Sequence, residues 1–346
     1  MDTWRFIIPC GLLLASTGLA RAEAKALDLK DTPKPVQKAV QLWMAGGSLD
    51  SLDQVQEPGR VTYEIEFTNK AGKPRDFTLA ENGTLLSLEI ALADAPAPVQ
   101  KTLKGLIGTG MLDSIEKNLD PDDTTFDIGL LTNDGKNRDF TLDGNGKIIS
   151  ERIELPDAPE VVQRAIKTQA AANPIEDIEK IFDEDNHATY QVALTTKDGT
   201  PRGFTIDGED GHLESMEIGL TETPAPVQKT VAGEVGTGQI ESIDKVFDPD
   251  GILYEVTYFA QAGSERQFTV DAEGNLASRE VALADTPAPV QQTIMQQLGR
   301  GNVLRIDRTF TENTAGVFSF EVQAKKDGKS FDFSVGPNGR FLGMDD

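Results

Sequence analysis

The chain has 346 residues, a formal net charge of −24 at pH 7 and a hydrophobic fraction of 38%. Such an acidic surface repels nucleic acid and anionic lipid, so it excludes both as expected partners and favours cations or proteins with basic patches. The single cysteine, Cys10, lies in an apolar leader, so we expect no disulfide, no thiolate metal site and no cysteine nucleophile in the rest of the chain.

Residues 1–22 have the pattern of a secretory signal peptide. Arg5 precedes an apolar run, and the run ends in the small-residue segment 20–22. A membrane anchor needs ~20 uninterrupted apolar residues, whereas this run is shorter and is broken by Pro9 and Gly11. We therefore expect cleavage near Glu23, a periplasmic or secreted location and no membrane insertion of the mature chain.

One phrase of about twelve residues recurs five times and indicates an internal repeat. It reads LKDTPKPVQKAV, LADAPAPVQKTL, LPDAPEVVQRAI, LTETPAPVQKTV and LADTPAPVQQTI, with its first glutamine at Gln37, Gln100, Gln163, Gln228 and Gln291. The separations of 63, 63, 65 and 63 residues predict five tandem units. Their predicted bounds are 29–92, 93–155, 156–220, 221–283 and 284–346.

Each unit is predicted to open with a helix. Prolines such as Pro287 and Pro289 stand in its first turn, where a missing N–H costs nothing. Apolar residues then recur at i, i+4 and i+8, which predicts one buried stripe, and a glycine-rich segment ends the helix. The recurring glutamine lies in the first helical turn, so we favour a structural role over partner contact.

Four strands are predicted after each helix. The first has apolar residues three and four apart, as in IESIDKVF, and we interpret it as a bulged strand. The second alternates strictly, which places one side in a core and the other in water. Its inward residues are Tyr63, Ile65 and Phe67; Phe126, Ile128 and Leu130; Tyr190, Val192 and Leu194; Tyr254, Val256 and Tyr258; and Phe320, Val322 and Ala324.

The third strand carries a phenylalanine in motifs such as RDFTL, and glycine turns precede and follow it. The fourth strand runs directly into the next helix. The sequence thus predicts an α+β fold of five tandem small units, each with one helix packed on a four-stranded antiparallel β-meander. Units of ~63 residues are marginal alone, so we expect neighbours to share interfaces. Residues Leu27 and Leu29 resemble the end of a fourth strand and predict a cap.

The units resemble the PepSY-like repeats related to β-lactamase inhibitor protein and, more distantly, the PepSY domains of protease propeptides. The resemblance rests on the helix, the IxxI strand, the DG hairpins and the DFT strand, and it spans residues 29–346. It implies a periplasmic or secreted binding or inhibitory module without catalysis. The β-lactamase inhibitor has two units and disulfides, whereas this chain has five predicted units and no cysteine after the leader, so the target stays open.

The sequence does not contain a recognisable catalytic set. After the leader there is no cysteine, and the two histidines are His187 in DEDNHAT and His212 in EDGHL. Both positions are typical of solvated turns, so an enzymatic function would rest on these two residues alone. We predict that the protein is not an enzyme and needs no cofactor.

Acidic turns are the best candidates for metal ligands, and calcium is the cation they would suit. None matches a complete twelve-residue calcium loop, and DPDG is also an ordinary type I turn, so a structural role is favoured. The candidate ligands are Asp120, Asp122, Asp183, Asp185, Asp248 and Asp250.

The outward face of the second strands is the largest surface left to bind a partner. Its candidate contacts are the acidic residues Glu64, Asp127, Glu255 and Glu321. The first functional hypothesis is a secreted or periplasmic non-catalytic binding protein that inhibits or sequesters an envelope protein. The alternative is an acidic, cation-responsive envelope protein that binds calcium.

Overall fold

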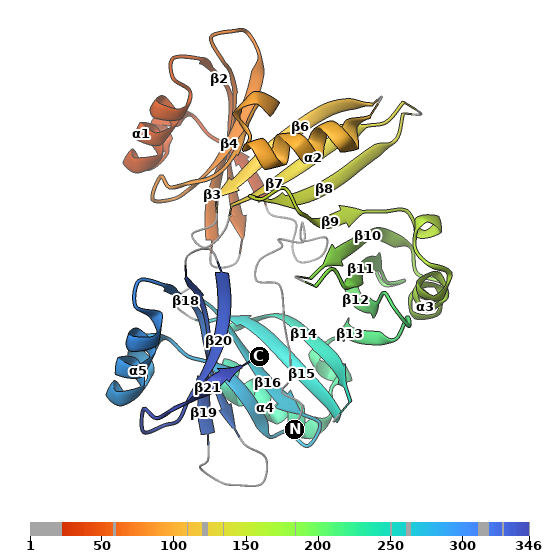
Figure 1. Ribbon diagram of the computed structural model, residues 1–346, viewed down its shortest axis with the longest axis vertical. Coiled ribbons are helices and arrows are strands. Elements are labelled where there is room, and N and C mark those ends of the chain that lie inside the picture. The colour runs from red at the N-terminus through yellow and green to blue at the C-terminus, as the bar shows by residue number, and fades with distance from the viewer. Residues whose placement is uncertain are drawn as a thin grey trace. The chain divides into compact units, whose positions relative to one another are not determined.

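A computed structural model describes residues 23–57, 60–108, 110–119, 124–133, 135–183, 185–249, 251–260, 264–310, 318–326 and 329–345 (Figure 1). The predicted signal peptide, residues 1–22, lies outside them. The described chain divides into two compact parts, residues 23–212 and residues 213–345, here called the N-terminal body and the C-terminal body.

The N-terminal body contains three α-helices and twelve strands. The helices are α1 (Lys34–Trp43), α2 (Ala97–Ile107) and α3 (Glu160–Ala170). The strands are β1 (Glu23–Ala26), β2 (Ser48–Glu57), β3 (Arg60–Thr68), β4 (Pro74–Ala80), β5 (Leu85–Glu89), β6 (Met111–Leu119), β7 (Thr124–Leu131), β8 (Asn137–Asp143), β9 (Ile148–Arg152), β10 (Ile175–Phe182), β11 (Ala188–Thr195) and β12 (Pro201–Asp207).

The C-terminal body repeats the same order of elements. Its helices are α4 (Ala225–Val235) and α5 (Ala288–Leu298). Its strands are β13 (Leu213–Glu217), β14 (Gln239–Asp248), β15 (Gly251–Phe259), β16 (Glu265–Asp271), β17 (Leu276–Glu280), β18 (Asn302–Phe310), β19 (Phe318–Lys326), β20 (Lys329–Val335) and β21 (Phe341–Asp345).

The predicted fold class is wrong, because the strands do not form five separate meanders. All 21 strands belong to one antiparallel sheet. The fourth strand of a predicted unit pairs with the first strand of the next, as in β5–β6, β9–β10, β13–β14 and β17–β18. A separate meander would leave these strand edges unpaired, whereas continued pairing satisfies their backbone groups. The chain is therefore dominated by one sheet rather than built as an α+β string of units, and the predicted unit boundaries stay predictions.

Each helix buries its apolar stripe against the strands that follow it. In the C-terminal body, Val290 and Ile294 of α5 are fully buried and share a core with Val322 and Phe333. Figure 1 shows α5 beside β19 and β20, the strands it contacts. Because strand residues alternate between faces, the helices cover one face of the sheet and the other face holds the intervening polar residues. The predicted inward positions of the second strands are confirmed where their residues are buried, as with Tyr190.

The predicted bulge in the first strand is confirmed. A register shift occurs at the same place in β2, β6, β10, β14 and β18, after Leu49, Leu112, Ile175, Ile240 and Val303. The extra residue explains why apolar residues there are three apart rather than two. The predicted glycine hairpins are also confirmed, since the glycine of the last turn has a positive φ in all five cases, for example 80° at Gly83.

Strand β1 confirms the predicted cap at the start of the sheet. It pairs antiparallel with β2. The amide of Leu27 then donates to the carbonyl of Leu52 at 2.9 Å, and the amide of Ile90 donates to Ile115 at the same distance where β5 meets β6. Strand β1 thus occupies the position on β2 that a fourth strand occupies elsewhere.

The recurring glutamine has the predicted structural role. Its side-chain Nε2 donates to the carbonyl five residues earlier, from Gln37 to Thr32 at 2.8 Å and from Gln291 to Thr286 at 2.7 Å. The same bond recurs at Gln100, Gln163 and Gln228. It ties each helix to the 3₁₀ turn before it.

Replacing this glutamine should destabilise the fold modestly. We expect Gln291→Ala to lower the free energy of unfolding by about 1 kcal/mol, because a half-buried hydrogen bond is lost. The matched control is Gln292→Ala on the exposed side of the same helix. Urea denaturation compares the two, and equal stabilities of both variants would contradict the role.

Candidate functional site

Acidic residues lie directly opposite one another on the sheet face that the helices leave uncovered. In β6 and β7, Glu116 pairs with Asp127, and in β14 and β15, Asp244 pairs with Glu255. Opposite residues of neighbouring strands project on the same face with Cβ atoms about 5 Å apart, where like charges repel. The same position holds Asp53 opposite Glu64 and Asp307 opposite Glu321.

The preceding strand extends three of these pairs into rows of three acids. We call them the acidic rows: Glu89–Glu116–Asp127 on β5–β7, Glu217–Asp244–Glu255 on β13–β15, and Glu280–Asp307–Glu321 on β17–β19. The corresponding positions on β9–β11 are Arg152, Glu179 and Gln191. Except for the exposed Glu321, the row members are half-buried.

Burial and repulsion from neighbouring acids raise the pKa values of five row carboxyls, Glu89, Glu116, Asp244, Glu255 and Glu280. Desolvation, followed by the charge of Asp244, raises the pKa of Glu255 from 4.5 to about 7. Desolvation also raises the pKa of Glu116, with further contributions from Asp76 and Asp127. The pKa values of Glu89, Asp244 and Glu280 are raised as well, with desolvation as the largest cause.

Arginines compensate part of this charge. Arg305 forms two hydrogen bonds to Asp307, from Nε at 2.5 Å and from Nη2 at 2.9 Å. It also donates to the side chain of Gln267, which in turn donates to Glu255. Arg75 lies 3.1 Å from Glu89, and Arg266 lies 3.6 Å from Glu280. The rows hold more acids than these three arginines, so the face favours cationic groups.

The predicted partner-binding residues occupy this face, and their binding role stays a prediction. Asp127, Glu255 and Glu321 are members of the acidic rows, and Glu64 lies opposite Asp53. Sequence reasoning missed the other two members of each row, which come from the neighbouring strands. The signal was present, since Glu116, Asp244 and Asp307 recur with the repeat period.

Three of the six predicted metal residues, Asp183, Asp185 and Asp248, lie among the described residues. Asp120, Asp122 and Asp250 lie outside them. The carboxylate of Asp183 accepts the backbone N–H of His187 at 2.7 Å, which is an ordinary turn contact. Asp248 lies opposite Gly251 at the end of a hairpin, and Asp185 is exposed. Calcium binding by these turns stays a prediction.

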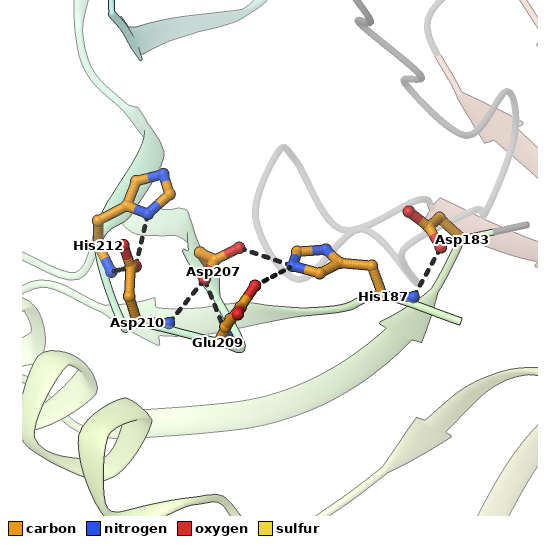
Figure 2. A network of polar contacts seen from close by, with 6 residues as sticks. All are labelled: Asp183, His187, Asp207, Glu209, Asp210 and His212. Atoms are coloured by element: carbon orange, nitrogen blue, oxygen red, sulfur yellow. Dashed lines mark hydrogen bonds and ion pairs between the residues drawn. The ribbon is translucent and has the colours of Figure 1, made fainter. Parts of the chain in front are cut away.

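A second polar cluster combines both histidines of the chain (Figure 2). They come from two neighbouring turns, residues 183–187 before β11 and residues 207–212 after β12. The Nε2 atom of His187 lies 3.1 Å from Oδ2 of Asp207, whose side chain is only 8% exposed. The Nδ1 atom of His212 lies 2.7 Å from Oδ1 of Asp210.

The same cluster contains a group of three possible metal ligands, found among the described residues. One ligand atom from each of Asp207, Asp210 and His212 lies within 4.8 Å of the other two. Hydrogen bonds from the backbone and imidazole of His212 lower the pKa of Asp210, so this carboxylate is ionised at neutral pH. Sequence reasoning placed the histidines in separate turns and missed their convergence, because the two turns are twenty residues apart.

The solved structures that resemble this chain do so only at low sequence identity and low TM-score. No protein-family model and no curated protein matches the chain. A "putative calcium-regulated periplasmic protein" from Bacteroides thetaiotaomicron is 15% identical, with a TM-score of 0.26, over 38% of this chain and 97% of its own. A "putative periplasmic protein from DUF2874 family" from Bacteroides vulgatus is 12% identical, with a TM-score of 0.24, over 37% and 96%. Another periplasmic protein from that species is 15% identical, with a TM-score of 0.25, over 37% and 95%.

At these identities and TM-scores the likeness carries no inference about function. All three neighbours are described as periplasmic, which is one of the two locations that the leader sequence predicts for this chain. The resemblance to PepSY-like repeats stays a prediction. None of the helices among the described residues has the length and hydropathy needed to span a bilayer.

Proposed function

We propose that this chain is a non-catalytic periplasmic binding protein whose acidic rows engage a protein partner with basic patches, and that binding inhibits or sequesters this partner. The observation that carries the proposal is the direct cross-strand pairing of acids at one recurring position, as in Glu116 with Asp127 and Asp244 with Glu255.

Like charges placed directly opposite in a sheet destabilise it, by a few tenths of a kcal/mol to about 1 kcal/mol for each pair. The alternation of apolar and polar residues along these strands requires only that the outward residues be polar. A threonine or glutamine would fit these positions as well as an acid. The chain itself offers this alternative, because Gln191 stands opposite Glu179 in β10–β11. The presence of paired acids in the acidic rows therefore favours a binding role, in which cationic groups of a partner offset the repulsion between the carboxylates.

The non-catalytic part of the proposal rests on the sequence and on the histidine geometry. After the leader the chain has no cysteine and two histidines, and both imidazoles contact carboxylates in turns. A binding protein requires only the surface itself.

The partner can be identified by affinity capture. Immobilised protein is exposed to envelope and secreted fractions at about 0.05 M and about 0.5 M salt, and captured proteins are read by mass spectrometry. We expect a stoichiometric basic partner at low salt that is released at high salt and is insensitive to chelator. A partner that is retained equally at both salt concentrations would contradict an acidic binding face.

Matched variants link the capture to the face. The row variant carries Glu116→Gln, Glu255→Gln and Glu321→Gln, one change in each acidic row. The turn variant carries Glu81→Gln and Glu273→Gln in hairpin turns and Glu160→Gln in the first turn of α3. All three residues are exposed and lie outside the rows. Both lose three carboxyl groups, so a difference in capture reports the position of the acids rather than their number. The proposal requires the row variant to lose the partner and the turn variant to keep it.

A further inference from the structure

The two histidine-bearing turns of the N-terminal body are held together by their backbones. The amide of Gly208 donates to the carbonyl of Ala188 at 2.9 Å. A Cβ atom at Gly208 would lie 2.3 Å from that carbonyl oxygen, so only glycine allows the turns to approach this closely. The approach brings His187 to the carboxylate of Asp207 (Figure 2).

The turn after β12 differs from the corresponding turns elsewhere in the chain. Those turns close over five residues, with amide-to-carbonyl bonds from Ala80 to Thr84, from Asp143 to Lys147 and from Asp271 to Asn275. The turn after β12 closes from Asp207 to His212, so it contains one residue more. Only this lengthened turn ends in histidine, and only its partner turn supplies a second one. The sister turns thus show that the hairpin can be made without histidine. An aspartate at the position of Asp207 does recur, at Asp143 and Asp271, and accepts backbone amides there too.

The side chains present a mixed imidazole and carboxylate donor set. Asp207 is anchored because its Oδ1 accepts the amides of Glu209 and Asp210, at 2.8 and 2.9 Å. Its second oxygen, Oδ2, faces His187. The side chains of Asp210 and His212 are 68% and 54% exposed, so each can rotate.

We infer that Asp207, Asp210 and His212 bind a borderline divalent cation of the zinc class, and that His187 positions Asp207. One imidazole and two carboxylates supply three ligands, and water completes a tetrahedral site. Imidazole suits zinc and its neighbours in the transition series, whereas calcium takes six to eight oxygen ligands. The contact from His187 to the ligating carboxylate corresponds to the outer hydrogen bonds that orient metal ligands.

The test is titration calorimetry of the purified protein with Zn²⁺ and, separately, with Ca²⁺. We expect one saturable Zn²⁺ site per chain that His212→Asn weakens at least about tenfold, and a smaller loss for His187→Asn. Both substituted side chains are partly exposed in turns, and circular dichroism verifies that the variants fold. The matched control is Glu273→Gln, an acid of the sister turn after β16, which should leave Zn²⁺ binding unchanged.

Three results would overturn the site. They are no saturable Zn²⁺ binding by the unmodified protein, equal Zn²⁺ affinity in the unmodified protein and the His212→Asn variant, or Ca²⁺ binding that depends on His212 as strongly as Zn²⁺ binding does. Equal affinity would place the bound metal on other carboxylates. Because the cluster contains no member of the acidic rows, failure of this site leaves the proposed partner-binding function untouched, and the reverse also holds.

Discussion

Raising the pH from about 5 to about 8 is expected to destabilise the C-terminal body. The pKa of Glu255 is 4.5 in an unfolded chain and about 7 in the folded protein. A carboxyl with a raised folded-state pKa contributes stability that is fully present below pH 4.5 and is lost as the pH rises through 7. The loss from this residue is at most about 3 kcal/mol, since each pKa unit corresponds to about 1.4 kcal/mol.

The charged and polar groups around Glu255 determine how far its pKa is raised, and so how much stability is lost as the pH rises. Asp244 on β14 and Asp307 on β18 oppose ionisation of Glu255. Arg305 on β18 and the side chain of Gln267 on β16 favour it. The raised pKa values of Asp244 and Glu280 act in the same direction as that of Glu255. Chemical denaturation at a series of pH values measures the effect. Glu255→Gln should make the profile flatter and raise stability at pH 8, whereas an unchanged profile in this variant would refute the assignment.

The row variant is expected to bind the captured partner at least about tenfold more weakly than the unmodified protein, a loss of about 1.4 kcal/mol. Each substitution removes a carboxylate from one acidic row, so the attraction for a basic patch falls. The same variant should be more stable at pH 8, because the acids that remain repel each other less. A stabilised protein with weakened binding is the opposite of what general misfolding produces.

The turn variant controls for long-range electrostatic attraction by the protein's net negative charge. It removes the same number of acids as the row variant, so a long-range effect of the protein's negative charge would weaken binding in both. Surface plasmon resonance at one ionic strength compares the affinities, and thermal denaturation compares the stabilities. Equal affinities in the two variants would show that net charge, rather than the acidic rows, attracts the partner.

Local features of the fold were predictable because each depends on neighbouring residues. The bulge follows from apolar spacing, as at Ile240, and the glutamine role follows from the position of Gln291 in the first helical turn. Hairpin turns such as that at Gly83 were predictable because glycine readily adopts the positive φ that the turn requires. The continuous sheet was not predictable in this way, because strand pairing such as that of β5 with β6 depends on how one predicted unit meets the next.

The candidate sites were less predictable for the same reason. An acidic row joins Glu89 to Asp127 across two strand pairings, one of which crosses a predicted unit boundary. The histidine cluster joins His187 to Asp207 through the approach of two turns. Alternation indicates which face a residue occupies, whereas the register that places acids opposite one another is set by hydrogen bonding between strands.

The most direct test of the acidic rows as the binding surface is to count the protons released when the partner binds. Calorimetry at pH 7 in two buffers of different ionisation enthalpy gives this number. Cationic groups that contact the rows lower the raised pKa values, so we expect net proton release, with on the order of half a proton from Glu255, whose pKa is about 7. Glu255→Gln should remove that share. Binding without proton release, or release that is identical in the Glu255→Gln variant, would contradict the proposed surface.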